Sequence, residues 1–271
     1  MVYNVPLALL SSYRHENVVV RSSDPGALAK AALEDDSTRI KAVQLLSPGR
    51  RADELIVLPP SVAIYLCLME LHQDEGIIPV WSQFFKDRSV RLVLPVVPGF
   101  GQVAKEAMRA GLRIMLVIDQ PDEALVEDLK DIFVFFTREP DVKEPVDFFC
   151  SLFSSFLTKR VESLWQIQEE HPSSYRYVTE SGEVTLSKRL DHTTYGSDLA
   201  SFLADHKLNL FVRKEECCSC RFFSHCEGYF KLPRDGYSCR AIKKLFDLMW
   251  DTATELRTDL SQAPRTAGAD L

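Results

Sequence analysis

The chain has 271 residues, of which 46% are hydrophobic and 26% are charged, and its net charge is −7. These proportions are ordinary for a soluble globular protein, and the length allows one large domain or a medium domain with a small one. The acidic balance lacks the basic footprint of a nucleic-acid-binding protein, so we expect no nucleic-acid partner.

Neither a leader nor a membrane anchor is indicated by the apolar segments. The first residues, MVYNVPLALL, carry no basic segment ahead of the apolar ones, which argues against a secretory signal. The longest apolar run, near residues 55–69, is interrupted by Pro59-Pro60. It is also shorter than the roughly 20 residues that span a bilayer. We therefore expect a cytoplasmic protein without a membrane partner.

The first part of the chain alternates strand-like and helix-like segments. A helix is expected over residues 25–34, because Ser23-Asp24-Pro25 places a capping residue before a proline of the first turn. In the mixed segment 76–86, three aromatic side chains, Trp81, Phe84 and Phe85, are expected to pack inward. Strands are expected at 17–23, 42–46, 54–59 and 62–68, the last of which could instead begin a helix.

The clearest repeating unit lies between residues 90 and 121. Two near-continuous apolar strands, 90–97 and 112–119, flank a helix that is expected from about Gln102 to Arg109. Another helix is expected to start at Pro121. Short links of this kind predict parallel neighbours joined by a right-handed crossover. Residues 1–160 therefore predict an α/β domain, either a partial barrel or an open sheet.

The pattern changes after residue 160, and residues 161–260 are expected to form a second region. Residues 175–190 alternate around a Glu-Ser-Gly turn, which predicts a hairpin. A short helix capped by Ser197 is expected over residues 197–206. Residues 240–260 repeat apolar side chains at three- and four-residue steps, which predicts an amphipathic helix. The tail, residues 261–271, is expected to be disordered.

Seven cysteines are present, and their distribution is uneven. Cys67 and Cys150 are isolated in apolar segments and are expected to be inert buried thiols. The other five lie within 23 residues, in the sequence CCSCRFFSHCEGYFKLPRDGYSC. Local clustering of this kind favours a metal site over a disulfide framework, whose cysteines are spread more evenly through a shorter chain.

The clustered cysteines show a spacing that suits four ligands. Cys217, Cys220, Cys226 and Cys239 follow the pattern Cys-x2-Cys-x5-Cys-x12-Cys, and Cys218 is a spare thiol. Four thiolates satisfy either a tetrahedral zinc ion or a [4Fe–4S] cluster, and the spacing alone does not choose between them. Nearby cations would offset the thiolate charge: Arg213, Lys214, Arg221, Lys231 and Arg234. Interleaved aromatic residues could shield the metal from water or dock a peptide: Phe222, Phe223, Tyr229, Phe230 and Tyr237.

The run from Glu216 to Cys239, E-C-x-x-C-x5-C-x-G-Y-F-K-x-P-x3-Y-x-C, resembles the SPASM region of radical SAM enzymes, most of which modify ribosomally made peptides. The resemblance covers about residues 160–260 and implies one auxiliary [4Fe–4S] cluster held by the four cysteines. The family's other auxiliary cluster needs an upstream cysteine pair and a cysteine where this chain has Phe230. A partial (β/α) barrel would fit the residues before 160.

The chain departs from the resembled family at one decisive point. Radical SAM enzymes hold their catalytic cluster with Cys-x3-Cys-x2-Cys near the start of the barrel, and no such triplet occurs here. The resemblance therefore implies a degenerate relative that kept an auxiliary cluster. Such a protein would be an accessory factor in peptide maturation that binds a peptide substrate or a partner maturation enzyme and relays electrons. Whether it is itself an enzyme is left open.

A second candidate site follows the strand at 90–97. Gly99, Gly101 and Ala104 match a relaxed dinucleotide-binding fingerprint, and Asp119 ends the next strand. In this reading a helix N-terminus would hold a pyrophosphate and Asp119 a ribose hydroxyl. The plainer reading is a tight turn that uses glycines. Two alternative functions therefore stand beside the accessory protein: a redox enzyme that binds a nucleotide here, and a structural zinc interaction module.

Overall fold

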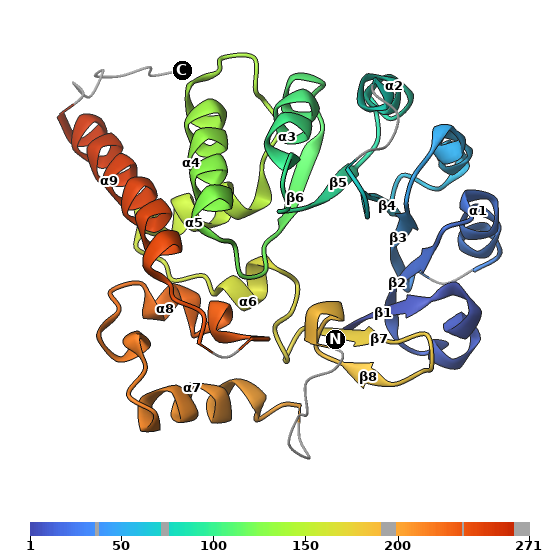
Figure 1. Ribbon diagram of the computed structural model, residues 1–271. Coiled ribbons are helices and arrows are strands. Elements are labelled where there is room, and N and C mark those ends of the chain that lie inside the picture. The colour runs from blue at the N-terminus through green and yellow to red at the C-terminus, as the bar shows by residue number, and fades with distance from the viewer. Residues whose placement is uncertain (36–37, 72–75, 191–198, 235, 263–271) are drawn as a thin grey trace, which may run out of the picture.

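An eight-stranded sheet forms the centre of the computed structural model, which describes all residues except 36–37, 72–75, 191–198, 235 and 263–271 (Figure 1). The strand order is β6-β5-β4-β3-β2-β1-β7-β8. Neighbouring strands are parallel throughout, except that β8 runs antiparallel to β7. The strands are β1 Val2–Pro6, β2 Asn17–Ser22, β3 Ile40–Leu46, β4 Ala63–Cys67, β5 Val90–Pro95, β6 Arg113–Val117, β7 Tyr175–Val178 and β8 Val184–Thr185. The expected α/β class with a mostly parallel sheet is confirmed.

Helices α1 to α4 lie along the outer side of the curved sheet (Figure 1). The α-helices are α1 Pro25–Glu34, α2 Ile77–Phe84, α3 Phe100–Arg109, α4 Glu123–Arg138, α5 Asp147–Thr158, α6 Leu164–Ile167, α7 Phe202–Val212, α8 Phe223–Cys226 and α9 Arg240–Gln262. The 3-10 helices are η1 Leu7–Tyr13, η2 Arg50–Val57, η3 Lys188–Leu190, η4 Glu216–Ser219 and η5 Tyr229–Lys231. No helix in the described part of the chain combines the length and apolarity needed to cross a bilayer.

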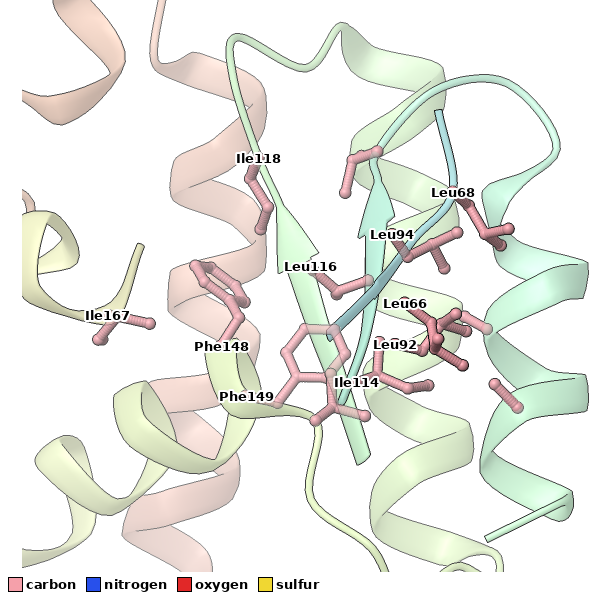
Figure 2. Close-up of a cluster of buried hydrophobic side chains, with 14 of the residues drawn as sticks. Leu66, Leu68, Leu92, Leu94, Ile114, Leu116, Ile118, Phe148, Phe149 and Ile167 are labelled. Atoms are coloured by element: carbon pink, nitrogen blue, oxygen red, sulfur yellow. The ribbon is translucent and has the colours of Figure 1, made fainter. Parts of the chain in front are cut away.

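The two faces of the sheet carry different side chains, because successive residues of a strand point to opposite sides. One face is fully apolar and packs under the helices; Figure 2 shows Leu66, Leu92, Leu94, Ile114 and Leu116 from three adjacent strands. The opposite face mixes apolar residues with polar ones, and it lines a cavity described below. The sheet therefore has a sealed side and an open side.

Most elements expected in the first part of the chain are confirmed. The strands expected at 17–23, 42–46, 62–68, 90–97 and 112–119 correspond to β2 to β6. The neighbours β5 and β6 are parallel, as the short links predicted. The Asp24 side chain caps α1 by accepting from the Ala27 N–H at 3.2 Å.

One expected strand is wrong. Residues 54–59 belong to η2 and the turn after it, and they pair with no strand. The buried residues of this segment are Ala52, Leu55 and Leu58, which recur every third residue. That spacing matches the period of a 3-10 helix, and it buries one stripe of η2 against α1. The segment 76–86 forms α2, where Trp81 and Phe85 are buried but Phe84 is 39% exposed.

The second half of the chain also follows the main expectations. Strands β7 and β8 form the predicted hairpin, and α9 is the predicted amphipathic helix. The three- and four-residue apolar spacing expected over residues 240–260 includes Leu256 and Leu260, but both side chains are exposed. The reason is that α9 extends beyond the end of α5, the helix packed against it. Arg257 donates hydrogen bonds to the carbonyl groups of Phe156 and Leu157, near the C-terminus of α5.

Two further expectations fall partly outside the described residues. The helix expected at 197–206 is described from Phe202 and runs on to Val212 as α7. Its predicted cap, Ser197, lies outside the described residues, as does the predicted tail beyond Gln262. Ser261 and Gln262 belong to α9, so the first two residues of the expected tail are helical.

The core is continuous across residue 160, where the sequence pattern changes. Trp165 and Phe246 belong to the same buried cluster as Leu92 of the sheet. Strand β7 also extends the sheet by pairing with β1. The region after residue 160 therefore completes the sheet, while the division into two domains stays a prediction.

Candidate metal centre

Four cysteines from different short elements meet at one small cavity of about 20 Å³. Cys217 lies in η4, Cys220 directly follows it, Cys226 ends α8 and Cys239 immediately precedes α9. All four line the cavity, whereas Cys218 is exposed and does not. The structure thus brings together the four cysteines whose spacing singled them out and leaves the spare thiol outside.

The thiols surround a space and do not converge on a point. In the described part of the chain, no three His, Cys, Asp or Glu side chains are grouped so as to hold a metal ion. Around zinc, with Zn–S bonds of about 2.3 Å, four sulfur atoms would lie roughly 3.8 Å apart. A [4Fe–4S] cluster is larger than one ion and spreads its cysteine ligands farther apart. The arrangement of the thiols alone does not choose between the two groups.

His225, a conceivable substitute ligand, does not line the cavity. Its ring is buried and lies 4.9 Å from the ring of Phe156 in an edge-on contact. Burial lowers the pKa of His225, as expected for a ring among aromatic side chains. The candidate donors at the cavity are therefore the four thiols and the carboxylate of Glu216, which accepts from two lysines and a backbone N–H.

The surroundings of the four thiols favour the protonated, neutral form of each sulfur when no metal is bound. Burial raises the pKa of Cys217 and Cys239, and nearby cysteines raise both further. Burial also raises the pKa of Cys226 to about 12, although hydrogen bonds from the backbone of residues 228–230 oppose the rise. Those N–H groups belong to Gly228 and to the first two residues of η5, and they point at the Cys226 sulfur. A metal displaces the thiol protons and removes the repulsion between the thiolates.

Glu216 organises the wall of this cavity. Its Oε1 accepts from Lys231 Nζ at 2.9 Å and from the Cys239 N–H at 2.8 Å, and its Oε2 accepts from Lys243 Nζ at 2.7 Å. Burial raises the pKa of the Glu216 carboxyl, but the Cys239 N–H and the two ammonium groups outweigh it and bring the pKa to about 2. One carboxylate therefore joins η4, η5 and the start of α9.

The cations near the cavity agree only in part with those expected, and Lys231 is the expected one that is found there. Lys231 is 7% exposed and lies beside the site. Arg221 pairs instead with Asp247, and Arg234 donates to Gln120. Lys243 lines the cavity, although a basic pair such as Lys243-Lys244 suggests solvated surface. The sequence could have indicated Lys243, because it lies four residues after Cys239 and residues at that separation share one face of a helix.

Aromatic side chains close the cavity from the core side. Phe222 and Phe230 are 2% and 1% exposed, and the ring of Phe246 lies 5.3 Å and 6.1 Å from theirs. Phe223 also lines the cavity. Tyr237 lies farther out and donates to the carbonyl group of Pro121 at 2.6 Å. A group held here would sit between an apolar wall and the lysine–glutamate wall, and such a shell controls water access.

The loop after Cys226 is shaped by a glycine that no other residue could replace without strain. Gly228 has φ +77°, a conformation that favours glycine. An added Cβ would lie 2.3 Å from Leu210 Cδ1 and 2.7 Å from His206 Nε2, because α7 packs directly on this turn. Gly228 thus lets α7 cover the cysteine loop.

The second candidate site is divided by the fold. Gly99, with φ +91°, and Gly101 line an open pocket of about 960 Å³ beside α2, α3 and α4. Asp119 does not line that pocket; its Oδ1 lies 3.6 Å from Arg189 Nη1. The pocket wall carries three acidic side chains, Glu106, Asp128 and Asp131, beside two basic ones, Lys105 and Arg109. The structure therefore keeps the two glycines together and directs the acid of the fingerprint elsewhere.

Arg189, which pattern analysis of the sequence missed, links the sheet to the cysteine segment. Its Nε donates to Glu170 at 2.8 Å, its Nη1 donates to the Leu232 carbonyl at 2.8 Å, and its guanidinium lies 4.0 Å from the Tyr229 ring centroid. Although burial favours the neutral form, Tyr229 and Glu170 raise the pKa of Arg189 further above its ordinary value. No local pattern marks it, because its partners lie 19 and 43 residues away.

No family model, no curated protein and no solved structure matches the chain. The resemblance to the SPASM region therefore rests on the motif from Glu216 to Cys239. The arrangement of side chains around the small cavity is a separate basis for assigning a function.

Proposed function

We propose that the chain holds one [4Fe–4S] cluster through Cys217, Cys220, Cys226 and Cys239. The observation that carries the proposal is the selective placement of the thiols: these four line one cavity and the adjacent Cys218 does not. Sulfur is the ligand that iron–sulfur clusters use, and four cysteines are the usual complement.

The wall of the cavity supplies what such a group requires. Lys231 and Lys243 place positive charge beside the thiolates, and Glu216 fixes both ammonium groups. Phe222 and Phe230 exclude water from the opposite side. When bound, a cluster supplies one-electron transfer, while the residues of this chain hold it, balance its charge and limit solvent access.

We further propose that the sheet is a partial (β/α) barrel and that the protein is a degenerate radical SAM/SPASM relative. The support is the sequential order of β1 to β6, with α1 to α4 along one side. The edge strands β6 and β8 do not pair with each other, so the curve stays open. Because the Cys-x3-Cys-x2-Cys triplet is absent, the role proposed is accessory: binding a peptide substrate or a partner maturation enzyme and relaying electrons for peptide maturation.

Anaerobic purification with metal and sulfide analysis tests the cluster. We expect brown protein with broad visible absorbance and about four iron and four sulfide per chain. Cys226→Ser should lose most of this content, and Cys218→Ser, the same change one residue from a proposed ligand, should retain it. Colourless protein loaded with zinc would support the structural zinc module instead. Equal metal content in both variants would refute the proposed ligand set.

The accessory role has its own test. A complete radical SAM maturation enzyme and its precursor peptide should bind the purified holoprotein, measured by calorimetry with each component separately. We expect binding of at least one of them and a change in the visible absorbance of the cluster when a one-electron donor is supplied. Absence of binding to both would remove the maturation role while leaving the cluster itself in place.

A further inference from the structure

A second, larger cavity lies on the open face of the sheet and has no role in the site above. Its volume is about 500 Å³, within the range of small-molecule sites. Inward-facing residues of β1 to β6 line it, together with the segments 168–170 and 175–188. Its floor is an apolar cluster made of Cys67, Val93 and Met115, with Leu46 and Val117 beside it. The small thiol-lined cavity shares none of these residues.

The polar side chains of the cavity wall are held in place by one another. Arg21 is 3% exposed; its Nη1 donates to Asn4 Oδ1 at 3.0 Å, and its Nη2 pairs with Glu180 at 3.0 Å. The amide of Gln44 donates to Cys67 Sγ at 3.0 Å and accepts from Asn4 at 2.8 Å. These bonds fix the wall before any ligand arrives, which lowers the cost of binding.

Each carboxylate on the wall has an arginine partner. Glu180 pairs with Arg21, Glu169 with Arg91, and Glu170 with Arg189. Because these three guanidinium groups are already paired with carboxylates, they are not available to bind a phosphate through two parallel hydrogen bonds. The carboxylates are likewise neutralised, so they do not call for a cationic ligand.

Lys188 is the exception. It lines the cavity from η3 and is exposed, and within the described residues its ammonium group has neither a carboxylate nor a hydrogen-bond acceptor. Tyr65 lines the same cavity, and its ring lies 4.8 Å from the Arg91 guanidinium. Burial raises the pKa of Tyr65 to about 12, so the phenol stays protonated and can donate. Arg176 also lines the cavity, and its Nη1 donates to the carbonyl groups of Pro172 and Tyr175. Lys188 thus places an ammonium group over an apolar floor, with neutral donors beside it.

We propose that this cavity binds a small organic carboxylate with an apolar body. The carboxylate would pair with Lys188, and the aromatic or aliphatic body would rest on Val93 and Met115. One ammonium group matches one singly charged carboxylate, and the apolar floor favours a body that water solvates poorly. This inference is independent of the cluster and would stand if the metal site held zinc.

Competition against a fluorescent reporter tests the proposal. The 271-residue chain is titrated with 8-anilinonaphthalene-1-sulfonate, an anion with an apolar ring system, and the reporter is then displaced by 3-phenylpropionate or by 3-phenylpropan-1-ol. These competitors have similar size and differ in charge. We expect one reporter per chain and displacement by the acid at about two- to five-fold lower concentration than by the alcohol, the range that one exposed ion pair supplies.

Three variants locate the binding. Lys188→Gln should remove the preference for the acid, whereas Lys30→Gln, which removes an equal charge from the exposed face of α1, should keep it. Val117→Trp fills the floor and should weaken displacement by acid and alcohol alike, with circular dichroism confirming that the variant is folded. Equal displacement by acid and alcohol in the unaltered protein, or equal behaviour of the two lysine variants, would overturn the proposal. So would reporter fluorescence that neither competitor reduces.

Discussion

The sheet region, residues 2–138, and the cysteine region, residues 215–240, are built in opposite ways. In the sheet region, strands that follow one another in sequence from β1 to β6 are neighbours in space, and long helices cover one face. In the cysteine region the helices have three or four residues, and ion pairs and aromatic contacts link them. Burial alone accounts for the first, whereas the second is arranged around a cavity. Substitutions in the two regions should therefore report different things: global stability in one, metal content in the other.

The largest effect on stability is expected in the sealed core of the sheet region. Leu116 is fully buried in β6, and Leu116→Ala should lower the free energy of unfolding by about 2–5 kcal/mol, because it removes apolar contacts and leaves a cavity. Urea denaturation followed by circular dichroism measures this. The control is Leu33→Ala on α1, where the side chain is 52% exposed and the cost should stay within about 0.5 kcal/mol. Equal costs at both positions would show that the sheet is not the stabilising unit.

A substitution at Gly228 tests the cysteine region through the same quantity, the free energy of unfolding. Gly228→Ala adds the strain of a positive φ and a clash with α7, together roughly 2–4 kcal/mol. Gly236→Ala is a matched control with φ +78° and open space around its Cβ, so it should cost only about 1 kcal/mol. If the comparison holds, Gly228→Ala also lowers the metal content, which Leu116→Ala does not. Identical behaviour of the two alanine variants would mean that α7 does not shape the loop.

The carboxylate of Glu216 tests the ion pairs that join the short helices. Glu216→Gln leaves the buried Lys231 ammonium with the longer ion pair to Glu215 at 3.5 Å and the carbonyl group of Tyr237, and a loss of about 1–3 kcal/mol is expected. Glu215→Gln, the neighbouring control, removes only that longer contact and should cost about 0.5 kcal/mol or less. Chemical denaturation of both variants decides the point. A larger loss for Glu215→Gln would assign the organising role to the wrong carboxylate.

The same contrast explains how far the sequence could be interpreted. Periodic apolar residues predicted β2 to β6 because each strand's burial is a local property of its own residues. The segment 54–59 misled, since its three-residue spacing matters only where α1 covers η2. Spacing selected four cysteines as candidate ligands, and these four do line one cavity. The residues that surround these cysteines could not be predicted in the same way. Lys243 and Glu216 lie 27 residues apart in sequence and form their ion pair only in the folded chain.

The open face of the sheet also contains features that the sequence alone could not predict. A buried arginine such as Arg21, or an unmatched lysine such as Lys188, carries no local signal, because its meaning depends on partners from distant strands. The sequence also placed Asp119 with Gly99 and Gly101, since consecutive strand ends meet at one edge of a sheet. The side chain turns toward Arg189 instead, a contact across 70 residues. Pairings at such separations are beyond what spacing can predict.

The smallest expected effect concerns the cap of α1. It tests whether a single local interaction in the sheet region contributes only a small part of the free energy of unfolding. Asp24 accepts a hydrogen bond from the Ala27 N–H at the start of α1, so Asp24→Ala should cost about 1 kcal/mol of unfolding free energy. Ser23→Ala, one residue earlier and exposed, should cost almost nothing. Because Asp24 and the sealed face of β6 share no partner, the double variant Asp24→Ala with Leu116→Ala should show additive costs in urea denaturation. A marked departure from additivity would mean that α1 and β6 are coupled through the sheet, and the regularity that made this region predictable would then be cooperative and not local.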